Sequence, residues 1–278
     1  MRRRDFVRTV AAAGVLPHFV GRTTAAATAA ASLKLGVASY SLRKFPLDKA
    51  LEMTVALDAK YINFKDVHIP RTDPPEAIRA ARAKAEAAGL TIMGGGTITM
   101  KNDEAQIRRD FEYARLAGMP LIVAAPSLDS LDAVERLAKE FDIRVAIHNH
   151  GPEDKYFPSP YDVYKAVKGR DKHMGLCVDV GHTVRAGADP TRAVLELRDR
   201  VYDLHVKDLR DLKDRSSQVI VGKGAIDVPG LFRALVKINF TGHVGLEYEI
   251  DENDPLPGMQ QSMSYMRGVM AALTSTSH

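Results

Sequence analysis

The stretch Leu176–Thr183, which reads LCVDVGHT, gives the first indication of the fold. A short apolar run ends in Asp179, and a glycine and a histidine come closely after it. Tyr202–Arg210, which reads YDLHVKDLR, has the same character, with His205 and Lys207 where the apolar run ends. Such short runs are typical of buried strands. Ionisable side chains at their ends are costly unless they are paired or bind a cation. The two stretches therefore predict buried strands whose ends carry a shared chemical site.

Six further apolar runs of this kind occur along the chain, and helical segments separate them. Leu47, Leu51 and Val55 recur at every fourth position, which is the spacing of one helix face. Strands that alternate with helices predict a parallel sheet, and eight units in about 240 residues favour a single (β/α)8 TIM barrel over an open doubly wound sheet. The expected strands are Lys34–Ala38, Tyr61–Lys65, Thr91–Gly94, Leu121–Ala124, Val145–His148, Gly175–Asp179, Val201–His205 and Val244–Glu247.

The N-terminal segment has a different composition from the rest of the chain. Arg2–Arg4 precede an apolar run from Thr9 to Val20, and Ala29–Ala31 offers a small-residue cleavage site. This order of parts is typical of an export signal, and the paired arginines favour the twin-arginine route. The apolar run is shorter than the ~20 residues of a membrane span, so we expect no stable membrane anchor. We predict a twin-arginine signal peptide over residues 1–31, a barrel over residues 32–278, and a periplasmic protein.

The charge of the chain depends on that signal. Residues 1–31 hold five arginines and one aspartate, which leaves 34 basic and 34 acidic residues in the remainder. A neutral domain gives no support to nucleic-acid binding, and we expect none. Cys177 is the only cysteine, so no intrachain disulfide can form and the fold depends on its apolar core. The sequence leaves open whether the chain forms a homo-oligomer.

Ionisable residues gather at the ends of the expected strands, which meet at one face of a barrel. Asp179 alone would be explained as a helix N-cap, but four neighbouring strands that end this way favour a shared metal site. Mixed carboxylate and imidazole ligands suit a hard or borderline divalent ion, and the lack of a cysteine cluster argues against structural zinc. The residues at this face are Lys65, His68, His148, His150, Glu153, Asp179, His182, His205, Lys207, Asp208, Glu247 and Glu249.

Five segments, in their order and spacing, resemble a known family. They are AIHNHGPED at Ala146–Asp154, CVDVGHT at Cys177–Thr183, LHVKD at Leu204–Asp208, GKGAID at Gly222–Asp227 and GHVGLEYE at Gly242–Glu249. Together they resemble the xylose isomerase-like barrels of the sugar isomerase and epimerase superfamily. That group includes tagatose 3-epimerases, inosose dehydratases, hydroxypyruvate isomerases and, more distantly, endonuclease IV.

The resemblance implies one divalent ion, manganese, magnesium, cobalt or zinc, held by Glu, Asp, His and Glu. Asp179, His205 and Glu247 match three of these positions. The family's glutamate on the fifth strand is missing, because His148 stands at that place. Some relatives with a His-Asn-His string carry a glutamate three residues after it, which corresponds to Glu153. We therefore predict Glu153 as the fourth ligand, with His148 or His150 as alternatives.

The chemistry that the resemblance implies is proton transfer next to a carbonyl group, through an enediolate. Glu247 and Glu153 would be the two catalytic carboxylates, with a histidine of the fifth strand as the alternative to Glu153. His182 would act as a third catalytic group, because it can titrate near neutral pH. The expected substrate-binding residues are Lys207, His150, His148, Lys65 and His68.

Export favours a small carbohydrate substrate that is not phosphorylated. We expect a metal-dependent isomerase or epimerase of a free sugar or keto-sugar. A lyase or dehydratase acting on a 3-keto-sugar, a keto-glycoside or an inosose is the first alternative, since it begins with the same proton transfer. A sugar-binding barrel without catalysis is the second alternative. A repair nuclease is disfavoured, because the domain is neutral and has too few further ligands for three zinc ions.

Overall fold

The structure, a computed structural model, describes residues 33–275. The signal peptide expected over residues 1–31, and with it the domain boundary, lies outside the described residues. Among residues 33–275, no helix combines the length and the apolar character that a membrane span requires.

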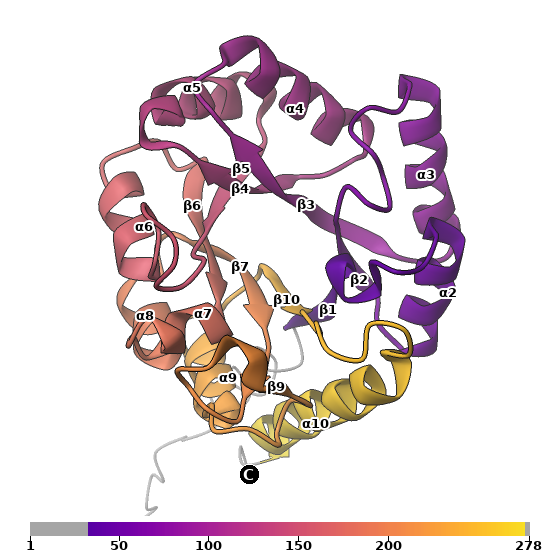
Figure 1. Cartoon of the computed structure of the whole chain (residues 1–278), viewed down its shortest axis with the longest axis vertical. Coiled ribbons are helices and arrows are strands. Elements are labelled where there is room, and N and C mark those ends of the chain that lie inside the picture. The colour runs from indigo at the N-terminus through magenta and orange to yellow at the C-terminus, as the bar shows by residue number, and fades with distance from the viewer. Residues whose placement is uncertain (1–32, 276–278) are drawn as a thin grey trace, which may run out of the picture.

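Eight parallel strands close into a barrel that helices surround (Figure 1). The barrel strands are β1 (Lys34–Ala38), β2 (Tyr61–Phe64), β3 (Thr91–Met100), β4 (Leu121–Pro126), β5 (Arg144–His148), β6 (Met174–Asp179), β7 (Val201–Val206) and β10 (His243–Leu246). Around the barrel their order is β1-β10-β7-β6-β5-β4-β3-β2. Each expected strand overlaps one of these, so the predicted (β/α)8 TIM barrel is confirmed.

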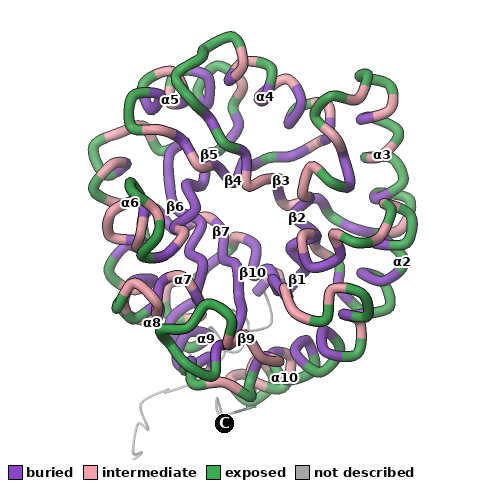
Figure 2. Tube along the Cα trace, viewed as in Figure 1, coloured by how far each residue is buried: buried purple, intermediate pink, exposed green. Residues whose placement is uncertain are grey.

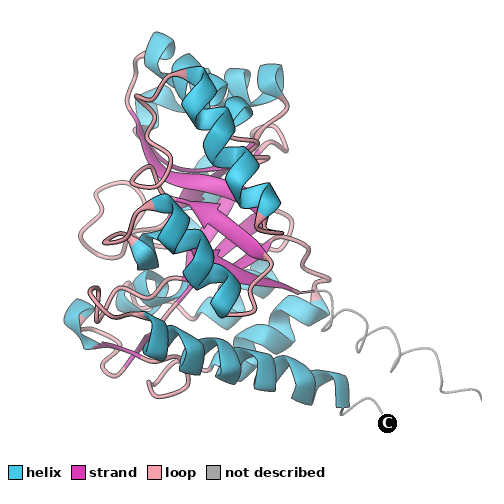
Figure 3. Ribbon diagram, turned by 90° about the vertical axis from the view of Figure 1, so that its right-hand side faces the viewer, coloured by secondary structure: helices cyan, strands magenta, loops and turns pink. Residues whose placement is uncertain are grey.

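The helices form the outer layer of the molecule, which Figure 3 shows from the side. Proline lies where several helices begin: Pro46 and Pro74 are N-cap residues, and Pro160 and Pro190 open their helices. The helices are α2 (Leu47–Ala56), α3 (Pro75–Ala87), α4 (Glu104–Leu116), α5 (Leu131–Phe141), α6 (Pro160–Val167), α7 (Val180–Arg185), α8 (Pro190–Glu196), α9 (Val228–Lys237) and α10 (Leu256–Ser275).

The core lies between the strands and the inward faces of the helices. Figure 2 shows the strands as largely buried and the outer helix faces as exposed. Val37, Ile62, Ile122, Val178 and Leu204 are fully buried in this layer. Burial of each such side chain contributes about 1.5–3 kcal/mol. This packing fixes the strands, and with them the side chains at the strand ends.

Strand β3 is longer than predicted: the expected strand ends at Gly94, whereas β3 continues through Gly95 and Gly96 to Met100. Gly94 and Gly95 lie so close to the segment that leads into β4 that a side chain at either position would not fit. A Cβ at Gly94 would lie 2.8 Å from the backbone oxygen of Leu121, and one at Gly95 would lie 2.3 Å from Sδ of Met119. The strand then shifts register between Gly95 and Ile98 and continues beside β4 to Met100. Glycine here permits close strand packing and does not mark the start of a loop.

Candidate active site

Four ionisable side chains from four neighbouring strands meet at the carboxyl end of the barrel. His148 ends β5, Asp179 ends β6, His205 lies on β7, and Glu247 comes directly after β10. Strand pairing places Asp179 beside His205, and His205 beside Gly245, two residues before Glu247. The four side chains are buried, and their ligand atoms all lie within 4.8 Å of one another. We refer to these residues as the four-residue cluster.

The distances within the four-residue cluster fit a shared ion. Nε2 of His148 lies 3.1 Å from Nδ1 of His205 and 3.5 Å from Oδ2 of Asp179. Oε1 of Glu247 lies 3.3 Å from Nδ1 of His205. Ligand atoms about 2.0–2.2 Å from one ion, at octahedral or tetrahedral angles, are about 2.8–3.6 Å apart. Oδ2 of Asp179 is buried and accepts no hydrogen bond from residues 33–275, and its cationic neighbour is Nζ of Lys207 at 3.1 Å, so it lies where a carboxylate oxygen meets positive charge.

Asp179 has a second role, because its other oxygen caps a helix. Oδ1 accepts the backbone N–H of His182 at 2.7 Å at the start of α7. Asn149 fixes the backbone of Asp179 by accepting its N–H at 3.0 Å, and its amide group also donates to Thr183 at 3.2 Å. The middle residue of the His-Asn-His string therefore joins the ends of β5 and β6, and holds Oδ2 of Asp179 toward the four-residue cluster.

Lys207 carries the positive charge closest to these carboxylates. Its Nζ lies 3.1 Å from Oδ2 of Asp179 and 2.7 Å from Oε2 of Glu247, and it also donates to Glu249. The side chain is only 5% exposed. Burial opposes its charge, but the three carboxylates outweigh burial and raise the pKa of Lys207 well above its usual value. Lys207 is therefore a permanent cation whose ammonium faces the same carboxylates as the ion would.

The two histidines of the four-residue cluster differ in protonation. Burial lowers the pKa of His148 to about 3, so its imidazole is neutral and available as a ligand. Burial also opposes the charge on His205, but the negative charges of Glu247, Asp203 and Asp179 raise its pKa to about 9. Burial opposes the charge of Glu247 as well, yet His205 and Lys207 together lower the pKa of that carboxyl. At neutral pH the site therefore holds ionised carboxylates, one neutral imidazole and one imidazolium.

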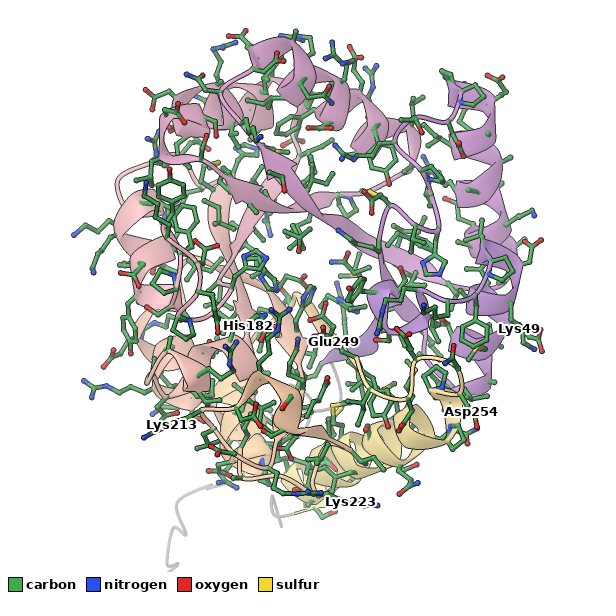
Figure 4. The ribbon with its side chains drawn as sticks, viewed as in Figure 1. Lys49, His182, Lys213, Lys223, Glu249 and Asp254 are labelled. Carbon is green, nitrogen blue, oxygen red and sulfur yellow. The ribbon has the colours of Figure 1, made fainter. Side chains whose placement is uncertain are left out.

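A pocket of about 420 Å³ opens beside Lys207. Figure 4 shows His182 and Glu249 toward the centre of the barrel opening, whereas Lys223 and Asp254 lie at the periphery of the molecule. The pocket is lined by Gly181, His182, Arg185, Lys207, Leu209, Asp214, Arg215, Ser216, Gln218, Glu249 and Ile250. Its size suits a small polar molecule bound within reach of the lysine.

One wall of the pocket is a short hairpin that the sequence did not predict. Strands β8 (Asp208–Leu209) and β9 (Gln218–Val219) pair antiparallel after β7. The Gln218 side chain donates to the backbone oxygen of Glu247 at 2.8 Å and accepts the N–H of Glu249 at 3.1 Å. The hairpin thus holds the backbone on which both glutamates lie.

Asp208 anchors the rest of this segment. Its carboxylate accepts four backbone N–H groups, those of Leu209, Gly222 and Gly224 at 2.9 Å and that of Ile226 at 3.1 Å. A Cβ at Gly224 would lie 2.1 Å from Oδ1 of Asp208, so only glycine lets the chain approach this closely. The segment 208–227 is therefore a tied loop built on one buried carboxylate.

The structure does not bring Glu153 to the four-residue cluster. Its side chain is 57% exposed and pairs with Arg185, which in turn contacts Nδ1 of His182 at 3.1 Å. His148 lies where the fourth ligand was expected. The ring of His150 is 4.3 Å from the ring of His148, but it is partly exposed and lies outside the four-residue cluster.

Two other candidates, Lys65 and His68, have local partners away from the four-residue cluster. Lys65 donates to the backbone oxygen of Thr97 at 2.8 Å. His68 is buried, with Nδ1 2.9 Å from Oγ of Ser39 and Nε2 3.2 Å from the backbone oxygen of Leu42. Burial lowers the pKa of His68, so the neutral ring ties the β2–α3 loop to the segment after β1.

Among the pocket residues, the sequence placed Glu249 at this face without a specific role, and it did not indicate Arg185 or Gln218. Glu249 stands two residues after Glu247, and an extended chain places such pairs on one side, so the spacing carried a signal. Arg185 stands three residues after His182, which is the spacing of neighbours on a helix. Gln218 carried no signal, because only the hairpin brings it to the strand end.

Comparisons with known proteins agree with this fold. Residues 56–269 match the family model described as xylose isomerase-like TIM barrel. The rhizopine catabolism protein MocC of Rhizobium meliloti is 27% identical over 141 residues, which are 45% of this chain and 42% of MocC. An inosose dehydratase of Mesomycoplasma hyopneumoniae is 26% identical over 160 residues, which are 51% of this chain and 53% of that enzyme. The chain thus spans about half the length of the curated relatives it matches.

The fold is also similar to that of solved structures. A structure of L-ribulose 3-epimerase superposes with a TM-score of 0.70 at 15% identity, and covers 88% of this chain and 96% of its own. A likeness at this identity supports the barrel architecture and carries nothing about the substrate.

Proposed function

Because the chain belongs to the xylose isomerase-like TIM barrel family, we propose that it is a metal-dependent enzyme that moves a proton next to a carbonyl group. The substrate we propose is a small keto-sugar or cyclic polyol ketone without phosphate. The observation that carries the proposal is the four-residue cluster, buried and within 4.8 Å, beside a pocket of about 420 Å³.

His148, Asp179, His205 and Glu247 would hold the ion, with His148 in the place where we expected Glu153. Manganese, magnesium, cobalt and zinc all accept such a set of carboxylate and imidazole ligands. When bound, the ion would act as a Lewis acid on the oxygen atoms of a substrate carbonyl. His148 needs to lose no proton for this, because burial keeps its pKa at about 3.

Glu247 is our candidate for the group that removes and returns the proton on carbon. Its two oxygens face different neighbours: Oε1 lies 3.3 Å from His205, and Oε2 lies 2.7 Å from Lys207. Lys207 would place its charge beside a substrate oxygen and stabilise the negative charge that develops there. His182 lines the same pocket and would exchange a proton with a substrate hydroxyl.

A dehydratase is the second candidate, and the curated relatives favour it. The matched inosose dehydratase is named for a dehydration reaction. It is 26% identical to this chain, compared with 15% for the L-ribulose 3-epimerase structure. Epimerisation and elimination start with the same loss of a proton next to the carbonyl. They differ in the second step: the proton returns to carbon in one, and a hydroxyl group leaves in the other.

The test is to incubate the protein with Mn²⁺ or Co²⁺ and a panel of free keto-sugars and inososes in deuterated water. Exchange at the carbon next to the carbonyl, monitored by proton NMR, would support the proposal. Elimination would appear as an unsaturated ketone that absorbs in the ultraviolet. Glu247→Gln should abolish both signals, and Glu153→Gln is the matched control that should keep them.

Two outcomes would contradict the proposal. Undiminished exchange in Glu247→Gln would remove the assigned role of this carboxylate. Sugar binding without exchange or elimination, for every substrate and ion tried, would indicate the sugar-binding barrel instead.

We also propose that residues 1–31 direct export by the twin-arginine route and that the enzyme works in the periplasm. The paired arginines and the apolar run of the sequence support this. Fusion of residues 1–31 to a reporter that is active only after export gives the test. Replacing Arg3 and Arg4 by Lys should abolish export of the fusion, and unchanged export would contradict the proposed route.

A further inference from the structure

A second group of polar side chains lies inside the barrel, below the four-residue cluster. It consists of Asn63 on β2, Cys177 on β6, Asp203 on β7 and His243 on β10, each at most 3% exposed. We call it the lower polar layer. Layers inside such barrels are usually filled by branched aliphatic side chains. Burying a carboxylate and an imidazole in their place costs free energy unless the two groups are paired or hydrogen-bonded.

Asp203 is the centre of the lower polar layer. The Asn63 amide, which reaches across the barrel, donates to Oδ2 of Asp203 at 3.1 Å. The Cys177 thiol lies 3.6 Å from the same oxygen. Nδ1 of His243 lies 3.2 Å from the other oxygen, Oδ1. Side chains from three strands therefore contact this carboxylate, two of them by hydrogen bonds to Oδ2 and His243 by its position beside Oδ1.

Two glycines make room for His243. A Cβ at Gly36 would lie 2.6 Å from Nε2 of His243, and a Cβ at Gly245 would lie 2.6 Å from Cε1 of the same ring. These positions belong to β1 and β10, which pair in register at Gly36 and Gly245. The ring thus fits only because both strands lack side chains where it lies.

The lower polar layer meets the four-residue cluster at His205. Asp203 and His205 stand two residues apart on β7, so both side chains point into the barrel. Nδ1 of His205 faces His148 and Glu247, at 3.1 Å and 3.3 Å. Its other nitrogen, Nε2, lies 3.7 Å from Oδ2 of Asp203 and donates no hydrogen bond to any residue between positions 33 and 275.

We propose that Asp203 is a positioning residue for His205, and that Asn63 and His243 hold Asp203 in place. A histidine that binds an ion through Nδ1 keeps a proton only on Nε2, and such histidines usually donate it to a carboxylate. Oδ2 of Asp203, 3.7 Å from Nε2, is the carboxylate oxygen that would favour this tautomer and keep Nδ1 toward the shared ion once the ion is bound. The inference rests on the proposed metal-dependent function, whose ion this histidine would bind.

The test compares Co²⁺ binding by the wild-type protein and by Asp203→Asn. We expect roughly a 10–100-fold weaker affinity in the variant, the usual effect of losing an outer partner of a metal ligand. The visible bands of bound Co²⁺ should also shift, because the ligand ring is no longer fixed; a purely structural role of Asp203 would leave them unchanged. Asp110→Asn is the matched control, because Asp110 is equally buried but pairs with Arg71, away from the site. The Asp110→Asn protein should bind Co²⁺ as the wild type does.

Wild-type affinity and an unchanged Co²⁺ spectrum in Asp203→Asn would overturn the inference while leaving the metal-dependent function intact. No ion binding by the wild-type protein would overturn both. If Asp203→Asn does not fold, nitrogen NMR of the histidines in the Zn²⁺-loaded wild type decides. A proton on Nε2 of His205 is expected, and a proton on Nδ1 would overturn the assignment.

Discussion

The affinity for the ion should depend steeply on pH, and one histidine sets that dependence. In the metal-free protein the pKa of His205 is raised to about 9 by the negative charges of Glu247, Asp203 and Asp179, which outweigh its burial. The pKa of His148 is lowered to about 3 by burial. At pH 7, therefore, His205 carries a proton on a nitrogen that the ion needs, and His148 carries none.

The size of the effect can be worked out from this competition. A ligand must lose its proton before it binds a metal ion. Below pH 9 the apparent affinity should fall about tenfold for each unit of pH, hence roughly 100-fold between pH 8 and pH 6. The stability of the metal-free protein has the opposite pH dependence: it decreases as the pH rises. A pKa raised from 6.5 to about 9 stabilises the fold fully below pH 6.5, and this contribution is lost as the pH rises through 9.

Calorimetric titration with Mn²⁺ at pH 7, in two buffers that differ in ionisation enthalpy, counts the protons released. We expect about one proton per bound ion, and a dissociation constant that rises about tenfold at pH 6. His173→Gln is the control, because this histidine also has a raised pKa but pairs with Asp142 and Asp171. Equal affinity at pH 6 and pH 8, with no proton released, would refute the assigned protonation of His205.

Three substitutions and one control test other features of the site. Lys207→Met leaves buried carboxylates without their cation, and should lower the free energy of unfolding of the metal-free protein by about 3–5 kcal/mol in a denaturant titration. Asp208→Ala removes the acceptor of four backbone N–H groups, and should cost about 1–3 kcal/mol and speed hydrogen exchange throughout residues 209–227. His148→Ala should weaken Mn²⁺ binding, measured by calorimetry, by more than the roughly 10–100-fold typical of an outer partner. Glu153→Gln should leave that affinity unchanged.

Unchanged stability of Lys207→Met would mean that the lysine does not balance the carboxylates. Normal exchange protection in Asp208→Ala would mean that the loop does not depend on its anchor. Stronger dependence of Mn²⁺ binding on Glu153 than on His148 would assign the fourth ligand position to Glu153.

The barrel could be predicted because its strands have clear local patterns. Runs such as Gly175–Asp179 are apolar, short and bounded at once by helix signals, and the structure places β6 at Met174–Asp179. The same local pattern placed Asp179 and His205 at strand ends. Parallel strands in a barrel end at one face, so the proximity of these side chains could be inferred from the fold alone.

Features that depend on how distant segments pack were not predictable. The sequence predicts that the third strand ends at Gly94, since a run of glycines is typical of a loop. In the structure these glycines allow the close approach of β4, which depends on packing between distant segments. The choice between His148 and Glu153 depends on where the chain turns after β5, and there Glu153 stays exposed and pairs with the buried Arg185. Asp203 belongs to an ordinary strand pattern in the sequence. Only the barrel brings Asn63 and His243 to it.

The most direct test of the proposed metal site is a crystal structure of the protein loaded with Co²⁺ or Mn²⁺, with the ion located by its anomalous scattering. We predict one ion within bonding distance of His148, Asp179, His205 and Glu247, with Nδ1 of His205 as its ligand atom and Glu153 still paired with Arg185. An ion bound by Glu153, or one bound away from these four side chains, would contradict the assignment.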